Sequence, residues 1–129
     1  MYDYIAPSVA GEFILRNFVT DLENYADDCG VNLRSDYTIC DDNYNACITT
    51  IQNGLRADKP VAALNLDYPI IGEGPYPWHW TTVTKYFHAP DDQRWIAIST
   101  FGDRVSIDFD AYYDNINGAA LHGGFAYFY

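Results

Sequence analysis

A single histidine between two tryptophans is the residue of this sequence best suited to chemistry. His79 lies in the stretch PYPWHWTTVTKYF, residues 75–87, between Trp78 and Trp80. An imidazole takes up and releases a proton near neutral pH, so it serves as a general base in many active sites. The same ring can instead be a structural group, and burying it without a hydrogen-bond partner would cost about 1–3 kcal/mol. The catalytic and the structural interpretation both remain open at this point.

The cysteines are the candidate nucleophiles. Cys29, Cys40 and Cys47 form no CxxC pair, and an odd number of cysteines favours reduced thiols over a disulfide framework. Cys40 stands just before a predicted helix, where the positive end of the helix dipole lowers the pKa of a thiol. Cys29 falls at the end of another predicted helix and Cys47 on an apolar stripe, so Cys40 is the preferred candidate. The three histidines are widely separated, so we predict no metal site and no cofactor.

The pattern of apolar residues changes midway along the chain. Helical spacing runs from Ser8 to Cys29 and again from about Asp42 to Leu55. After residue 60 the period becomes two, which is typical of strands. We expect strands at residues 61–66, 78–87, 94–100, 103–109 and 123–129. The sequence therefore predicts an α+β fold in a single domain, residues 1–129, with two N-terminal helices followed by an antiparallel sheet of four to five strands.

The charge of the chain narrows the possible partners. Eighteen acidic against seven basic residues give a net charge of −11. Nucleic acids and anionic membrane surfaces attract basic proteins, so we expect neither as a partner. No apolar run is long enough to span a bilayer, and the N-terminus has no signal-peptide pattern. Among the carboxylates, Asp108 and Asp110 flank Phe109 at a strand end, a spacing that favours a helix cap for AYY over an acid–base pair.

Over roughly residues 45–110 the chain resembles the C-terminal half of papain-like cysteine peptidases, in particular the bacterial branch related to bacteriocin-processing peptidases. The similarity lies in the motifs KPVAALNL, HWTTVTKYF and ISTFG, in that order. In that family a strand of the form PV follows a helix, and an HW pair opens the strand that bears the catalytic histidine. The resemblance therefore implies the C-terminal, half-barrel part of a papain-like fold.

The resemblance also implies roles for individual residues. His79 would be the general base and Ser99 or Thr100 would orient its ring during peptide-bond hydrolysis through a thiol ester. Gly74, Trp78 and Trp80 would contact the peptide substrate, although the tryptophans also suit a packing role.

Two features depart from the family. Its nucleophilic cysteine lies upstream, at the start of a central helix, and no cysteine precedes the first predicted helix here. Ser99 carries no charge to stabilise an imidazolium. We therefore expect a peptidase-like chain that is inactive as it stands, either the C-terminal portion of a larger domain or a member that has lost its nucleophile.

The alternative is a non-catalytic binding, inhibitor or immunity-type module. It would engage a basic partner through its acidic surface and the aromatic loop 72–80. A homodimer is a further expectation, since apolar surface left by a missing half would favour self-association.

Overall fold

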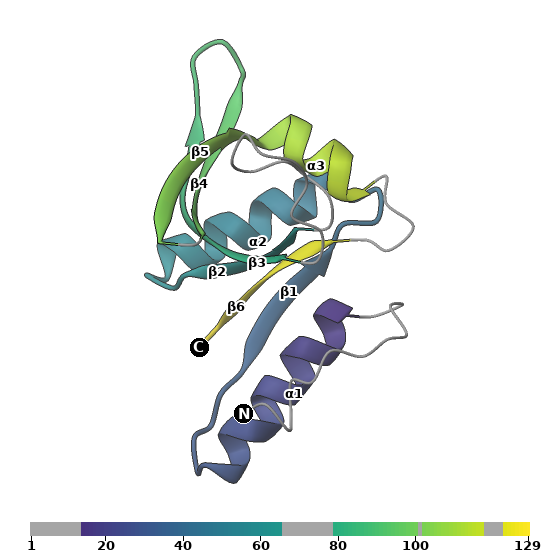
Figure 1. Ribbon diagram of the computed structural model, residues 1–129, viewed down its shortest axis with the longest axis vertical. Helices are drawn as coiled ribbons and strands as arrows, with labels where there is room; N and C mark the ends of the chain where they lie inside the picture. Colours follow the sequence, from purple (N-terminus) through teal and green to yellow (C-terminus); the bar gives the residue numbers. More distant parts are fainter. Residues whose placement is uncertain (1–13, 66–78, 101, 118–122) are drawn as a thin grey trace.

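The structure is a computed structural model that describes residues 14–65, 79–100, 102–117 and 123–129 (Figure 1). Within these ranges it has three helices and six strands. In chain order they are α1 (Ile14–Asp28), β1 (Ser35–Ile39), α2 (Tyr44–Arg56), β2 (Val61–Asn65), β3 (His79–His88), β4 (Arg94–Thr100), β5 (Asp103–Asp108), α3 (Phe109–Asn117) and β6 (Gly124–Phe128).

All six strands form one open antiparallel sheet in the order β1-β6-β2-β3-β4-β5. The last strand of the chain, β6, lies between the first two, where Phe125 pairs with Thr38 of β1 and with Ala63 of β2. Strand β3 carries an irregularity between Val83 and Lys85, so its side-chain alternation shifts there relative to β4. Strands β1 and β5 are the edges of the sheet.

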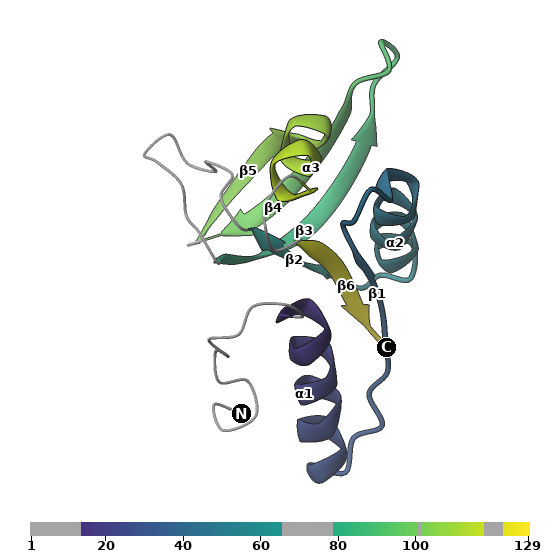
Figure 2. The same cartoon turned by 90° about the vertical axis from the view of Figure 1, so that its right-hand side faces the viewer.

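Helices cover both faces of the sheet around β6. Helices α2 and α3 pack on one face, where Ile51 and Tyr112 share a core with Val83 and Ile98. Helix α1 packs on the other face, where its residue Leu15 shares a second core with β6. Figure 2 shows α1 on the opposite side of β6 and β1 from α2. Because β6 is covered on both faces, its apolar sequence GFAYF needs no polar side.

The α+β class and the antiparallel sheet are confirmed, but the described sheet has six strands rather than four to five, and the expected order of elements is wrong. The chain does not begin with two consecutive helices, because strand β1 separates α1 from α2. This strand is the short segment SDYTI, and its partner β6 lies at the other end of the chain. Within the described residues the sheet is open, and the papain-like half-barrel form of the fold is not confirmed.

Helix α3 was not among the predicted helices, but a capping role for the aspartates beside AYY was predicted. The backbone N–H of Ala111 donates a hydrogen bond to the Asp108 carboxylate over 3.0 Å, which caps the first turn as the spacing of the two aspartates predicts. The helix follows β5 without a loop, so its buried residues Phe109 and Tyr112 extend the core next to β4.

Candidate functional site

Cys40, the candidate nucleophile, is inaccessible in this structure. Its side chain is fully buried, and its sulfur lies 2.7 Å from the sulfur of Cys47. Burial, followed by the hydrogen bond with Cys47, raises the pKa of the Cys40 thiol far above its ordinary value. Because the thiolate is the reactive form, a thiol in this environment is a poor nucleophile. The pKa of Cys40 is therefore raised by burial, and not lowered as the dipole of helix α2 alone would predict.

The structure does not bring Ser99 and Cys40 together. Ser99 is exposed on β4, next to Ile98, whose side chain packs in the same core as Cys40. Successive side chains of a strand point to opposite faces, so Ser99 and Cys40 lie on opposite faces of the sheet. Thr100, the other candidate for orienting a histidine, is buried.

The histidine and its neighbours are described only in part. The backbone of His79 begins β3 and pairs with Asn65 of β2, whereas its side chain lies outside the described part of the structure. Gly74 and Trp78 lie outside the described residues, as does most of the loop 72–80.

Trp80 has a packing role. Its ring stacks on the ring of Phe18, with the centroids 4.2 Å apart and the planes at 29°. Phe18 in turn meets Phe128 edge to face. Trp80 therefore packs helix α1 against the sheet. This contact fits the packing role that was one of the two expectations for this tryptophan.

A group of carboxylates and tyrosines gathers where α3 meets the start of α2. The hydroxyl of Tyr44 donates a short hydrogen bond to the carboxylate of Asp110. The ring of Tyr44 packs edge to face against Tyr113, with centroids 5.0 Å apart. Burial is the main cause of the raised pKa of Tyr113, and the nearby charge of Asp42 adds to it. Asp114, exposed, follows Tyr113 on α3. We call Asp42, Asp110 and Asp114 the acidic patch.

A cation from the β3–β4 hairpin lies beside this patch. The guanidinium of Arg94 sits over the ring of Tyr44, 5.6 Å from its centroid, and 3.6 Å from the carboxylate of Asp92. Burial and the hydrogen bond to Asp110 raise the pKa of the Tyr44 hydroxyl, while Arg94 opposes this shift. The hydroxyl therefore stays protonated and keeps donating to Asp110 at physiological pH.

Sequence reasoning missed this group because its members are far apart in the chain. Tyr44 and Asp110 are separated by 66 residues. The local signals are the short segments DDNY and DFDAYYD, in which acidic and tyrosine residues lie within a few positions of one another.

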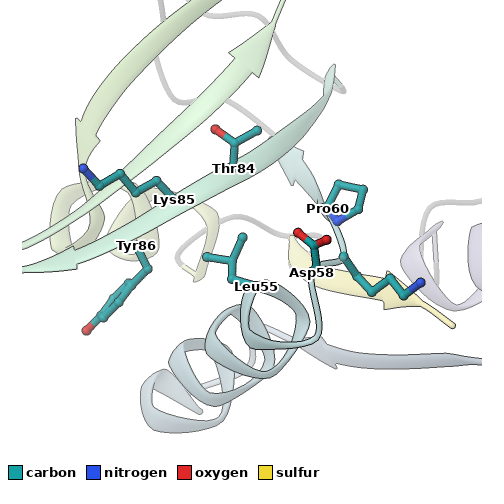
Figure 3. A pocket seen from close by; sticks show the side chains of 7 residues that line it. Leu55, Asp58, Pro60, Thr84, Lys85 and Tyr86 are labelled. Atoms are coloured by element: carbon teal, nitrogen blue, oxygen red, sulfur yellow. The ribbon is translucent and has the colours of Figure 1, made fainter.

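An open pocket of about 380 Å³ lies at the other end of α2, next to the irregularity of β3 (Figure 3). Both lysines of the chain, Lys59 and Lys85, line it together with Asp58. Figure 3 shows the ammonium of Lys85 extending away from the carboxylate of Asp58. The charged groups labelled there do not converge on one position, so the pocket has no defined centre for an ionic ligand.

Among the described residues, no group of three or more histidine, cysteine, aspartate or glutamate side chains is placed to hold a metal ion. No helix of the described part of the chain is both long and apolar enough to cross a membrane.

Comparison with known proteins places the chain in no family. No protein-family model matches it, and neither the curated proteins nor the solved structures contain a significant match.

Proposed function

We propose that this chain is a non-catalytic binding module that engages a basic protein or peptide through the acidic patch. The observation that carries the proposal is that Asp110 accepts a hydrogen bond from Tyr44 and the charge of Asp42 acts on Tyr113, while Asp114 lies about one turn after Asp110 on α3. The chain has an excess of eleven acidic over basic residues, so its net charge is strongly negative. Lysine and arginine side chains of a partner would supply the missing positive charge.

The geometry of α3 supports this proposal. Asp110 and Asp114 are four residues apart, so their carboxylates lie on the same side of the helix and repel each other. Such a pair costs an isolated helix about 0.2–0.5 kcal/mol, and a bound cation would remove that cost. The net negative charge would in addition speed the encounter with a basic partner, and this effect falls as salt rises.

Binding of poly-L-lysine tests the proposal. The test variant carries Asp42→Asn, Asp110→Asn and Asp114→Asn, and the matched control carries Asp58→Asn, Asp91→Asn and Asp103→Asn. Both sets remove three charges, and the control positions are exposed and outside the patch. We expect the affinity of the test variant to fall about tenfold or more, and that of the control about twofold, as measured by fluorescence anisotropy at low salt.

Two outcomes would contradict the proposal. Equal losses in the two variants would mean that poly-L-lysine senses only the overall charge and not the patch. Absence of binding by the unmodified chain at low salt would mean that its acidic surface does not bind cationic peptides. Circular dichroism of both variants confirms that the fold is intact.

The second proposal is a papain-like cysteine peptidase that is truncated or has lost its nucleophile, supported by the resemblance and by the place of His79 at the first residue of a strand. An active member would hydrolyse peptide bonds through a thiol ester. It requires a thiolate paired with His79. Iodoacetamide labelling near pH 6, with mass mapping of each cysteine, tests for it. Rapid labelling of one cysteine that is lost in His79→Ala would show an intact peptidase-like site and contradict the loss of the nucleophile. Uniformly slow labelling would show that this chain has no activated thiol, so that peptidase activity could belong only to a longer parent protein.

A further inference from the structure

Cys40 and Cys47 form an isolated pair of thiols in the core. Both side chains are completely buried, and their sulfur atoms are 2.7 Å apart. A disulfide bond joins two sulfur atoms about 2.04 Å apart, so only a small further approach separates these thiols from a bond. The third cysteine, Cys29, is exposed at the end of α1 and lies outside this core.

Hydrogen bonds hold the backbones of the two cysteines in place. Cys40 follows β1, and its N–H donates a 2.8 Å hydrogen bond to the carbonyl of Gly123. Cys47 lies in the first turn of α2, and its N–H donates to the carbonyl of Asn43 over 3.2 Å. The backbones of the two cysteines are therefore held by separate elements, and the surrounding core confines both buried side chains.

The surroundings suit a neutral sulfur group. The core around the pair consists of apolar and tyrosine side chains. Burial raises the pKa of the Cys40 thiol, so in the folded chain Cys40 does not supply a thiolate for catalysis or for binding a hard metal ion. A disulfide carries no charge and no S–H donor, so burying it in an apolar core costs less free energy than burying two thiols.

We propose that Cys40 and Cys47 form an intramolecular disulfide by exchange with a low-molecular-weight disulfide. One cysteine thiolate attacks a sulfur of the small disulfide, forms a mixed disulfide and releases the first small thiol. The second cysteine thiolate then displaces the second small thiol. The cysteine pair loses two electrons and two protons, and the small disulfide gains them as two thiols, so the exchange balances.

Burial determines when this exchange takes place. Neither sulfur is accessible in the folded chain, so the reaction must proceed during folding or through opening of residues 40–47. Once formed, the bond would link the end of β1 to the first turn of α2 and enclose the segment 41–46. The same burial would protect it from reduction. This inference holds whether or not the acidic patch binds a partner.

The test uses the full chain with the substitution Cys29→Ser, which leaves only the buried pair. The protein is unfolded in urea and refolded with glutathione disulfide in excess over glutathione, or with reduced glutathione alone. We expect the first sample to lose about 2 Da and both alkylatable thiols, and its midpoint of thermal unfolding to rise by about 5–10 °C. After refolding, the bond should persist in reduced glutathione and break when urea is added.

Other outcomes would overturn the proposal. Two alkylatable thiols after oxidative refolding would show that the pair does not bond, and a glutathione adduct on either cysteine would show that the second displacement fails. Lower thermal stability of the oxidised sample would show that the bond does not fit the fold. Cys29→Ser/Cys47→Ala is the control, and it should show no loss of 2 Da.

Discussion

The side chain of Tyr44 contacts both helix α3 and the β3–β4 hairpin. Its hydroxyl donates to Asp110 of α3, its ring packs against Tyr113, and the guanidinium of Arg94 lies over the ring. One residue thus joins α2, α3 and the β3–β4 hairpin. Removing the hydroxyl would leave the half-buried carboxylate of Asp110 without this donor.

We predict that Tyr44→Phe lowers the free energy of unfolding by about 1–2 kcal/mol, because the ring stays but the hydrogen bond to Asp110 is lost. Urea denaturation measures the change. Tyr129→Phe is the control, since the ring of Tyr129 is 58% exposed and its loss of a hydroxyl should cost less than about 0.5 kcal/mol. Equal effects of the two substitutions would mean that the contact with Asp110 does not stabilise the fold.

The turn between β3 and β4 contains a pH-sensitive contact. A ring nitrogen of His88 lies 2.6 Å from the carboxylate of Asp92. The hydrogen bond from His88, and next the charge of Arg94, lower the pKa of Asp92. A carboxyl group with a lowered pKa stabilises the fold above the ordinary carboxyl pKa of about 3.9, and this contribution is lost as the pH falls through the lowered value.

His88→Ala should therefore raise the pKa of Asp92 toward its ordinary value, and Arg94→Gln should raise it less. Titration of the Asp92 side-chain carbon by NMR between about pH 2 and pH 6 measures both shifts. A larger shift in Arg94→Gln than in His88→Ala would show that the charge of Arg94, and not the hydrogen bond, dominates at this turn.

Among the elements, β6 connects the two cores. Phe125 and Tyr127 face α2 and α3, while Ala126 and Phe128 face α1. At its first residue, Gly124, a Cβ atom would lie 2.4 Å from the carbonyl oxygen of Thr38. Strand β1 and helix α1 therefore approach the backbone of β6 closely at this point.

We predict that Gly124→Ala destabilises the protein by about 3 kcal/mol, because the clash is with the backbone of β1 and cannot be relieved by a side-chain rotation. The matched control is Gly102→Ala, where φ is +85° and nothing lies within 4 Å of the added atom. At Gly102 the substitution should lower the free energy of unfolding by about 1–2 kcal/mol, because alanine is strained in the left-handed backbone conformation. An equal or smaller loss in Gly124→Ala, measured by urea unfolding, would argue against this tight packing of β6.

At the scale of the whole molecule, the net charge of −11 opposes the compact state through repulsion between carboxylates. We predict that raising the NaCl concentration from about 20 mM to about 200 mM increases the midpoint of thermal unfolding, because it shortens the range of these repulsions. The triple variant of the acidic patch should gain less from salt. A midpoint that falls with salt would show that attractive ion pairs outweigh the repulsion.

A homodimer remains a proposal for the whole molecule. Strands β1 and β5 are edges of an open sheet, and an edge strand can pair with a second copy. Size-exclusion chromatography with light scattering, at low and high salt, measures the mass in solution. We expect dimer to increase with salt, because like charges on two copies repel, and a monomer at high concentration in high salt would contradict the proposal.

The sequence alone was sufficient for the parts of the fold that depend on neighbouring residues. Helix α2 and strands β2 to β6 begin and end close to their predicted limits, because each has a clear apolar period or a turn at its ends. The cap of α3 by Asp108 was also predictable, since a cap needs only residues three apart.

The parts that depend on distant residues were decided only by the tertiary structure. Strand β1 is recognisable as a strand only because β6, at the far end of the chain, lies beside it. Cys40 precedes a helix, which by itself favours a reactive thiol, but its complete burial against Cys47 reverses that expectation. The acidic patch likewise exists because folding brings Asp110 to Tyr44. Local spacing determines where helices and strands form, whereas burial and the pairing of distant groups determine what their side chains can do.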